Sequence, residues 1–271
     1  MDTYIPDIMP GAEPFYYPGG RVGCLCLHGL SASPAEVSWL GQDLAERGLT
    51  VYGPRLAGHG LTDYRQLGRQ RWQDWYTSAL DGYHLLRATC DQVFVAGLSM
   101  GGLLTLLLGA SVPVAGLVVM AAPLTLANIH QLARARWIKY GRPYMHFPDR
   151  SDFPQRLIAQ QERRGDAIRG RVRYDDWATQ SLEELYNLMA VAEGALPRIS
   201  APALLMYSEG DETVSPLSQQ IASDRIGSED VRCVTFQRSG HILTQDHDYP
   251  AVLEQAAAFI EAHTTEVRQP R

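Results

Sequence analysis

The chain has 271 residues, of which 45% are hydrophobic and 20% are charged, and its formal net charge at pH 7 is −6. This composition is ordinary for a globular protein that can bury a core of useful size. The mild acidity and the lack of a basic stripe argue against a nucleic-acid-binding protein.

Short apolar runs alternate with helical patterns along the first part of the chain. Strands are predicted over Val22–Leu27, Thr50–Tyr52, Gln92–Ala96 and Ala115–Met120. Helices are predicted between Ser33 and Gly48, over Trp72–Ala88 and over Gly101–Ala110. Such alternation is typical of βαβ units and a mostly parallel sheet.

The first helix is predicted to start at Ser33-Pro34-Ala35-Glu36. Pro34 suits the first helical position, and Ser33 and Glu36 have the spacing of a capping box. We therefore expect both side chains to cap this helix, which Gly48 should end.

The alternation stops near Leu124 and resumes near Pro197. Beyond that point the predicted elements are strands over Ala203–Tyr207 and Val231–Phe236 and helices from Ser215-Pro216 and over Pro250–Ala262. The intervening stretch of about 70 residues is far longer than an ordinary loop. We predict an α/β fold with a mostly parallel sheet of six or seven strands. Residues 1–123 and 198–271 would form the core, and 124–197 a helical lid at the carboxyl edge of the sheet, where ligands bind.

A candidate nucleophile lies in Gly97-Leu98-Ser99-Met100-Gly101, a G-x-S-x-G pentapeptide. It follows a predicted strand and opens a predicted helix, which is the setting of a nucleophile elbow. Such a turn holds the serine in strained geometry and needs small neighbours, which Gly97 and Gly101 supply. It also leaves the Ser99 hydroxyl exposed at a helix N-terminus.

A serine hydroxyl needs a base, and the chain has eight histidines. His241 follows the strand Val231–Phe236 at the edge expected for Ser99. Enzymes with a nucleophile elbow of this kind use the chain order serine, acid, histidine. This order favours His241, His247 and His263 over His28 and His59. His247 lies farther from the strand end and His263 at the end of the last helix. His241 is therefore the predicted base, and His28 and His59 are predicted to brace loops.

The orienting acid is expected just after the strand Ala203–Tyr207, where Glu209, Asp211 and Glu212 compete. Asp211 is four residues past the strand, so its loop can turn back toward His241. Asp211 is the predicted acid, with the other two as alternatives.

Two backbone N–H groups are predicted to form an oxyanion hole. Met100 follows the nucleophile, and Leu30 lies in the loop after the first core strand, where Gly29 permits close approach. No spacing of His and Cys suggests a metal site, and no cofactor is expected.

Aromatic residues recur in the inserted segment, at Trp137, Tyr140, Tyr144 and Phe147. They could line an acyl pocket, or they could form a small core of the lid itself. The cluster Trp72, Trp75 and Tyr76 has helical spacing and is predicted to pack in the main core.

These residues together resemble the α/β-hydrolase superfamily, and more closely its small bacterial carboxylesterase and monoacylglycerol lipase family. The matching stretches are His28–Pro34, Leu56–Gly60, Trp72–Trp75, Gly97–Gly102, Gly210–Val214 and Ser239–His241. The resemblance implies Ser99, Asp211 and His241 as the triad and Leu30 and Met100 as oxyanion donors. It implies a serine carboxylic-ester hydrolase for short- to medium-chain acyl esters, including monoacylglycerols.

The same triad would serve a thioesterase, an amidase or a carbon–carbon bond hydrolase, and a non-catalytic ligand-binding protein of this fold is a remoter alternative. The expected partner is a small-molecule ester, and the sequence does not indicate an oligomeric state.

The longest apolar stretches are too short to span a bilayer, and residues 1–18 lack the features of a signal peptide. Four cysteines without a CxxC motif are read as buried free thiols. A cytoplasmic location is therefore expected.

Overall fold

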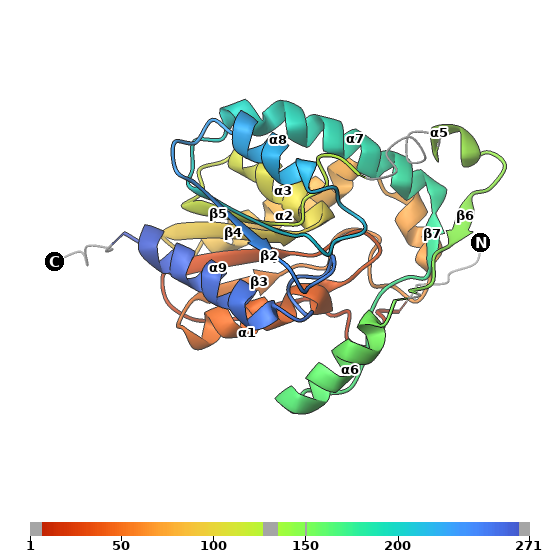
Figure 1. The fold of residues 1–271 in the computed structure, drawn as a ribbon, viewed down its shortest axis with the longest axis horizontal. Coiled ribbons are helices and arrows are strands. Elements are labelled where there is room, and N and C mark those ends of the chain that lie inside the picture. Colours follow the sequence, from red (N-terminus) through yellow and green to blue (C-terminus); the bar gives the residue numbers. More distant parts are fainter. Residues whose placement is uncertain (1–6, 127–134, 150, 266–271) are drawn as a thin grey trace.

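The computed structural model describes residues 7–126, 135–149 and 151–265. Figure 1 shows the main sheet with helices on both faces. The strands are β1 (Phe15–Tyr17), β2 (Val22–Leu27), β3 (Thr50–Gly53), β4 (Gln92–Leu98), β5 (Gly116–Met120), β6 (Tyr144–His146), β7 (Asp176–Ala178), β8 (Ala203–Ser208) and β9 (Val231–Phe236). All six predicted core strands are present.

Seven strands form the main sheet in the order β1-β3-β2-β4-β5-β8-β9. Six of them are parallel, namely β3, β2, β4, β5, β8 and β9, with Leu27 beside Gly97 and Leu98 beside Met120 at the carboxyl ends. The edge strand β1 runs antiparallel to β3 and was not predicted. The parallel arrangement brings the loops after β2, β4, β8 and β9 to one edge.

Helices cover both faces of this sheet. The α-helices are α1 (Ser38–Glu46), α2 (Trp72–Arg87), α3 (Met100–Gly109), α5 (Ala135–Ile138), α6 (Phe153–Arg164), α7 (Thr179–Ala195), α8 (Leu217–Arg225) and α9 (Tyr249–His263). Short 3₁₀ helices are η1 (Pro34–Val37), η2 (Tyr64–Arg69) and η3 (Leu196–Arg198). In Figure 1, α1 and α9 lie on one face, and α2, α3, α7 and α8 on the other.

The helix that follows Ser99 is apolar on all sides, as expected for a helix buried against a sheet and a second helix layer. Residues 100–108 of α3 are all buried. On the same face Trp75 is fully buried, as predicted, whereas Trp72 and Tyr76 pack at the margin of this core. The start of α3, and with it Ser99, is thereby fixed.

The capping box predicted at Ser33 and Glu36 is wrong. The segment begins as η1, and Ser33 makes no side-chain cap. Its hydroxyl donates to the carbonyl of Val172 at 2.9 Å, and Glu36 accepts a hydrogen bond from the N–H of Gly29 at 3.0 Å. Tertiary partners have replaced the local ones. Gly48, with φ of 90°, does end the region of α1 as predicted.

The inserted segment contains α5, β6, α6, β7 and α7, and its residues 127–134 lie outside the described ranges. The strands β6 and β7 pair antiparallel and were not predicted. Because β5 and β8 are parallel, the chain must return from the carboxyl edge to the amino edge, and α7 makes this return while packing on α3. Its residues Leu188, Met189 and Ala192 belong to the main core.

The four cysteines are free thiols. Cys24, Cys26 and Cys90 are buried as predicted, but Cys233 is exposed on the edge strand β9. Among the described residues, no helix is both long enough and apolar enough to cross a membrane.

Candidate active site

Ser99 lies in the sharp turn between β4 and α3. Its φ and ψ are 57° and −119°, a conformation that is costly for any residue with a side chain. Its N–H donates to the carbonyl of Met120 on the neighbouring strand at 2.8 Å. The turn therefore holds the side chain out at the carboxyl edge of the sheet.

Gly97 and Gly101 are required by contacts around this turn. A Cβ atom at Gly97 would lie 2.2 Å from the carbonyl oxygen of Gly101. A Cβ atom at Gly101 would lie 2.1 Å from the carbonyl oxygen of Leu27. Both distances are impossible for a real side chain, so any residue but glycine would displace the backbone beneath Ser99.

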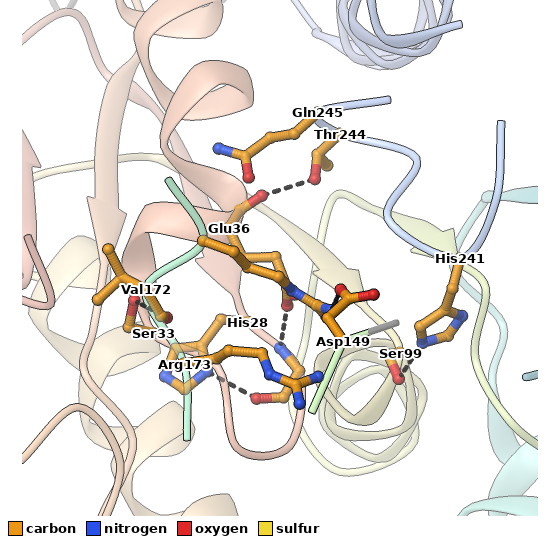
Figure 2. A network of polar contacts seen from close by, with 12 residues as sticks. His28, Ser33, Glu36, Ser99, Asp149, Val172, Arg173, His241, Thr244 and Gln245 are labelled. Carbon is orange, nitrogen blue, oxygen red and sulfur yellow. Dashed lines mark hydrogen bonds and ion pairs between the residues drawn. The ribbon is translucent and has the colours of Figure 1, made fainter. Parts of the chain in front are cut away.

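His241 contacts Ser99 directly, as Figure 2 shows. Its Nε2 atom lies 2.8 Å from the hydroxyl oxygen of Ser99, and its Nδ1 atom lies 2.7 Å from Oδ2 of Asp211. The carboxylate can only accept, so Nδ1 carries the proton and Nε2 is free to accept the hydroxyl proton of Ser99. This is the tautomer that a general base requires.

Asp211 is held by backbone as well as by His241. Its Oδ1 atom accepts the N–H groups of Thr213 and Val214 at 2.8 and 3.0 Å. Burial by itself raises the pKa of Asp211, but the charge of His241 and these hydrogen bonds outweigh burial. The pKa of Asp211 thus lies below its ordinary value, and the group is an anion when His241 becomes charged.

The other predicted alternatives do not meet Ser99. Glu209 and Glu212 have exposed side chains in the loop that carries Asp211. His263 contacts the carbonyl of Phe259 and the carboxylate of Asp230 at the end of α9. His247 is exposed.

His28 and His59 are fully buried, side by side, with ring centroids 5.0 Å apart. His28 donates from Nδ1 to the carbonyl of Gly29 at 2.9 Å and accepts the N–H of Leu56 at 3.2 Å. Burial lowers the pKa of His28 to about 4 and also lowers the pKa of His59. Both are neutral braces of loops, in line with the prediction.

Leu30 and Met100 are the two residues predicted to supply oxyanion donors. Met100 is the first residue of α3, so its N–H has no carbonyl of the preceding turn to bind. Leu30 lines the same cavity as Ser99 and follows Gly29, where a Cβ atom would lie 3.4 Å from Cβ of Ser99. The loop that carries Leu30 thus passes close to the nucleophile.

A cavity of about 510 Å³ opens above Ser99 and His241. One part of its lining is apolar and belongs to the main core or packs on it: Leu30, Leu126, Trp177, Leu182, Leu185 and Val214. The other part is charged and comes largely from the inserted segment: Glu36, Asp149, Asp152, Arg156, Arg171, Arg173, Glu212, Arg238 and Asp246. The site can therefore hold an amphiphilic molecule across Ser99.

The four arginines of the lining are each paired with a carboxylate. Arg156 contacts Asp246 through two bonds of 3.1 Å, and Arg171 contacts Asp149 at 2.7 Å. Arg173 and Arg238 pair with neighbouring aspartates. Every arginine of the cavity lining thus has a carboxylate partner.

The aromatic residues singled out in the sequence do not line this cavity. Trp137 and Tyr140 are 68% and 80% exposed, so they form neither an acyl pocket nor a lid core. Tyr144 packs against Tyr64. Phe147 packs at a tilted angle against Trp177, which lines the cavity, as does Phe153.

Sequence reasoning missed Glu36 and Arg171 as residues of the site. Glu36 was assigned to a helix cap, and the arginines of the inserted segment were not among the predicted site residues. In the described part of the chain, no group of three or more His, Cys, Asp or Glu side chains could hold a metal ion.

The sequence model of the family described as Serine aminopeptidase, S33 matches residues 21–248. The chain belongs to this family. It is therefore an enzyme, a serine hydrolase with the α/β-hydrolase fold. It is similar to a thermostable monoacylglycerol lipase of Bacillus sp. (strain H-257), with 34% identity over 259 residues, 94% of this chain and 97% of that protein.

It is also similar to a carboxylesterase of Bacillus subtilis (strain 168), with 27% identity over 250 residues, 92% of this chain and 96% of that protein. Among solved structures, one of the metagenome-derived lipolytic enzymes LipS and LipT matches with a TM-score of 0.85 and 31% identity, over 95% of this chain and 100% of its own. The monoacylglycerol lipase of Paleococcus ferrophilus matches with a TM-score of 0.76, at 17% identity over 93% of this chain and 99% of its own, which speaks for the fold alone.

Proposed function

We propose that this hydrolase cleaves carboxylic esters through a Ser-His-Asp triad and an acyl-enzyme. The observation that carries the proposal is the unbroken chain of hydrogen bonds from Ser99 through His241 to Asp211, at 2.8 and 2.7 Å. The strained turn at Ser99 supports the same assignment, because such strain is kept where it serves a reaction.

In the first half-reaction, the hydroxyl oxygen of Ser99 attacks the ester carbonyl carbon and its proton moves to Nε2 of His241. Asp211 stabilises the imidazolium that forms. The N–H groups of Leu30 and Met100 stabilise the negative oxygen of the tetrahedral intermediate. The alcohol then leaves with the proton from His241.

In the second half-reaction, His241 takes a proton from water, and the resulting hydroxide attacks the acyl carbon on Ser99. The same two N–H groups stabilise the second tetrahedral intermediate. Collapse releases the acid and restores the hydroxyl of Ser99. The groups that this cycle uses all belong to the chain itself.

We further propose that residues 124–197 act as a lid, with 1–123 and 198–271 as the core. Trp177, Leu182 and Leu185 from this segment line the apolar part of the cavity, and Arg171 and Arg173 line the charged part. Residues from both halves of α7 belong to the main core, so the covering part of the segment lies before this helix.

The cavity supports a substrate with one acyl chain and a small polar alcohol. Its volume of about 510 Å³ lies in the range in which pockets enclose a single small ligand. The apolar lining would take an acyl chain of short to medium length. Because the lining arginines are already paired, the charged part favours an uncharged alcohol with several hydroxyls, such as the glycerol of a monoacylglycerol.

A kinetic panel tests this proposal. We would compare kcat/KM for butyrate, octanoate and palmitate esters, for monooctanoyl and trioctanoyl glycerol, and for a matched thioester and amide. The proposal expects octanoate esters and the monoacylglycerol to be the best substrates. Faster cleavage of the triacylglycerol than of the monoacylglycerol would contradict it. A preference for the amide or thioester would instead identify an amidase or thioesterase. A cytoplasmic location stays a prediction from the sequence.

A further inference from the structure

Glu36 is a buried acid that the mechanism above does not use. It is only 6% exposed and lines the same cavity as Ser99. Oε2 of Glu36 accepts the N–H of Gly29 at 3.0 Å, and its backbone carbonyl accepts the hydroxyl of Thr244 at 2.6 Å. Figure 2 shows Glu36 between Thr244 and His28. A carboxylate in such a place needs an explanation, because burial of a charge is costly.

Gly29 is the residue before the proposed oxyanion donor Leu30, and it is fixed from two sides. Glu36 binds its N–H, and Nδ1 of His28 donates to its carbonyl at 2.9 Å. A Cβ atom on Gly29 would lie 2.9 Å from Oε2 of Glu36 and 3.4 Å from Cβ of Ser99. The backbone of Gly29 thus lies between the carboxylate of Glu36 and the nucleophile.

The residue after Leu30 is strained. Ser31 has a φ of 61°, a conformation that costs energy for any residue with a side chain. A loop in this state keeps its shape only where its surroundings hold it. Hydrogen bonds on both sides of Leu30 therefore decide where its N–H points.

The inserted segment supplies part of this restraint. Three of its residues contact the stretch from Ser31 to Glu36. Nη2 of Arg171 contacts Oε1 of Glu36 at 3.4 Å, and the carbonyl of Val172 accepts the hydroxyl of Ser33. The N–H of Tyr174 donates to the carbonyl of Ser31 at 2.8 Å. Arg171 is itself held by Asp149 at 2.7 Å.

We propose that Glu36 is a positioning residue for the oxyanion hole, and that Arg171 neutralises its charge. This inference rests on the proposed ester hydrolysis. Glu36 fixes the peptide unit before Leu30, so that the N–H of Leu30 points at the developing oxyanion. An unpaired carboxylate at this place would repel that oxyanion, since the low dielectric of a buried site strengthens repulsion. The guanidinium of Arg171 offsets this repulsion.

The first test separates the hydrogen bond of Glu36 from its charge. Glu36→Ala removes the acceptor for Gly29, whereas Glu36→Gln keeps an acceptor and removes the charge. We expect Glu36→Ala to lower kcat at least about tenfold with little change in KM, a fraction of the loss of about 100- to 1,000-fold that follows removal of an oxyanion donor. Glu36→Gln should stay within about threefold of the wild type, as expected when the hydrogen bond is retained.

A trifluoromethyl ketone reports on the oxyanion hole independently of turnover. The hydroxyl of Ser99 adds to its carbonyl carbon, the proton moves to His241, and the ketone oxygen becomes an oxyanion. Its inhibition constant should rise for Glu36→Ala by about the factor by which kcat falls, because both report on the same tetrahedral geometry. Unchanged kcat and unchanged inhibition for Glu36→Ala would overturn the proposal.

Glu184→Ala is the matched control. Glu184 is also a buried glutamate, 4% exposed, that accepts a backbone N–H, that of Trp72 at 3.2 Å, and pairs with an arginine, Arg71 at 2.7 Å. It does not line the cavity. Its loss should lower the melting temperature but leave kcat and ketone inhibition unchanged. If Glu184→Ala lowered kcat as much as Glu36→Ala does, the role of Glu36 would be structural only.

The second test asks whether Arg171 acts through Glu36. Arg171→Met removes the cationic partner of both Glu36 and Asp149 and should lower kcat about tenfold. The same change in a Glu36→Gln background, where only Asp149 loses a partner, should cost less than about threefold, as coupled residues behave. Equal losses in both backgrounds would refute the coupling. Activity retained by Ser99→Ala would instead overturn the proposed mechanism, which keeps the two failures distinct.

Discussion

Replacement of Asp211 by asparagine probes the geometry behind His241. One carboxylate oxygen of Asp211 accepts from Nδ1 of His241 at 2.7 Å, and the other accepts from Thr213 and Val214 at 2.8 and 3.0 Å. Asparagine has nearly the same volume, and its single carbonyl oxygen can keep the two backbone hydrogen bonds. Its NH₂ group then faces His241 and presents a donor where the wild type presents an acceptor.

This donor forces His241 to carry its proton on Nε2, which can then no longer accept the proton of Ser99. A wrong tautomer of this kind lowers kcat by about 10⁴-fold, or about 5.4 kcal/mol in activation free energy. KM should change little, because Asp211 is not among the residues that line the cavity. The variant should fold, since the volume and the backbone hydrogen bonds of the loop remain.

The assay is the initial rate of hydrolysis of p-nitrophenyl butyrate, with the melting temperature measured in parallel. Glu209→Gln is the control, because Glu209 is exposed in the same loop and undergoes the same chemical change. The reasoning would be refuted if Asp211→Asn kept more than about a tenth of the wild-type kcat. An equal loss in Glu209→Gln would refute it as well.

Three further predictions concern stability and substrate choice. Burial lowers the pKa of His28 from 6.5 to about 4, so the neutral side chain contributes about 3 kcal/mol of stability above pH 6.5 that is lost as the pH falls toward 4. The free energy of unfolding in urea should therefore depend less on pH between 4 and 6.5 for His28→Gln than for the wild type. Gly101→Ala should lower the free energy of unfolding by about 3 kcal/mol or more, because its Cβ would lie 2.1 Å from the carbonyl oxygen of Leu27; a melting temperature like that of the wild type would contradict this. Trp177→Ala should change the ranking of acyl chain lengths in kcat/KM, whereas Trp137→Ala removes an exposed side chain outside the cavity lining and should not. Equal effects of the two substitutions would contradict the place of Trp177 in the cavity lining.

The core strands could be predicted because their signal is local. Val231–Phe236 was predicted with the bounds that the structure has. The elbow at Ser99 could be predicted from a strand, two glycines and a helix in succession. The edge strand β1 was missed because it has three residues and one neighbour, and none of its three residues is fully buried. A short edge strand of this kind leaves little apolar pattern to read.

The roles of Glu36 and Trp137 could not be predicted because they depend on partners far along the chain. The spacing of Ser33 and Glu36 fits a helix cap, but Glu36 binds Gly29, seven residues before it, and Arg171, 135 residues after it. Trp137 is of a residue type that is common in ligand pockets, yet its side chain is exposed. The local sequence pattern indicates which roles a side chain can have, and tertiary packing determines which of these roles it takes.

The central claim is that Ser99 is the nucleophile, and covalent labelling tests it most directly. The wild-type protein would be incubated with a fluorophosphonate probe, digested and analysed by mass spectrometry, with Ser99→Ala treated in the same way. We predict one probe molecule on the peptide that contains Ser99, no labelling of Ser99→Ala, and loss of butyrate ester hydrolysis in parallel. Labelling at another residue, or ester hydrolysis that survives in Ser99→Ala, would contradict the account.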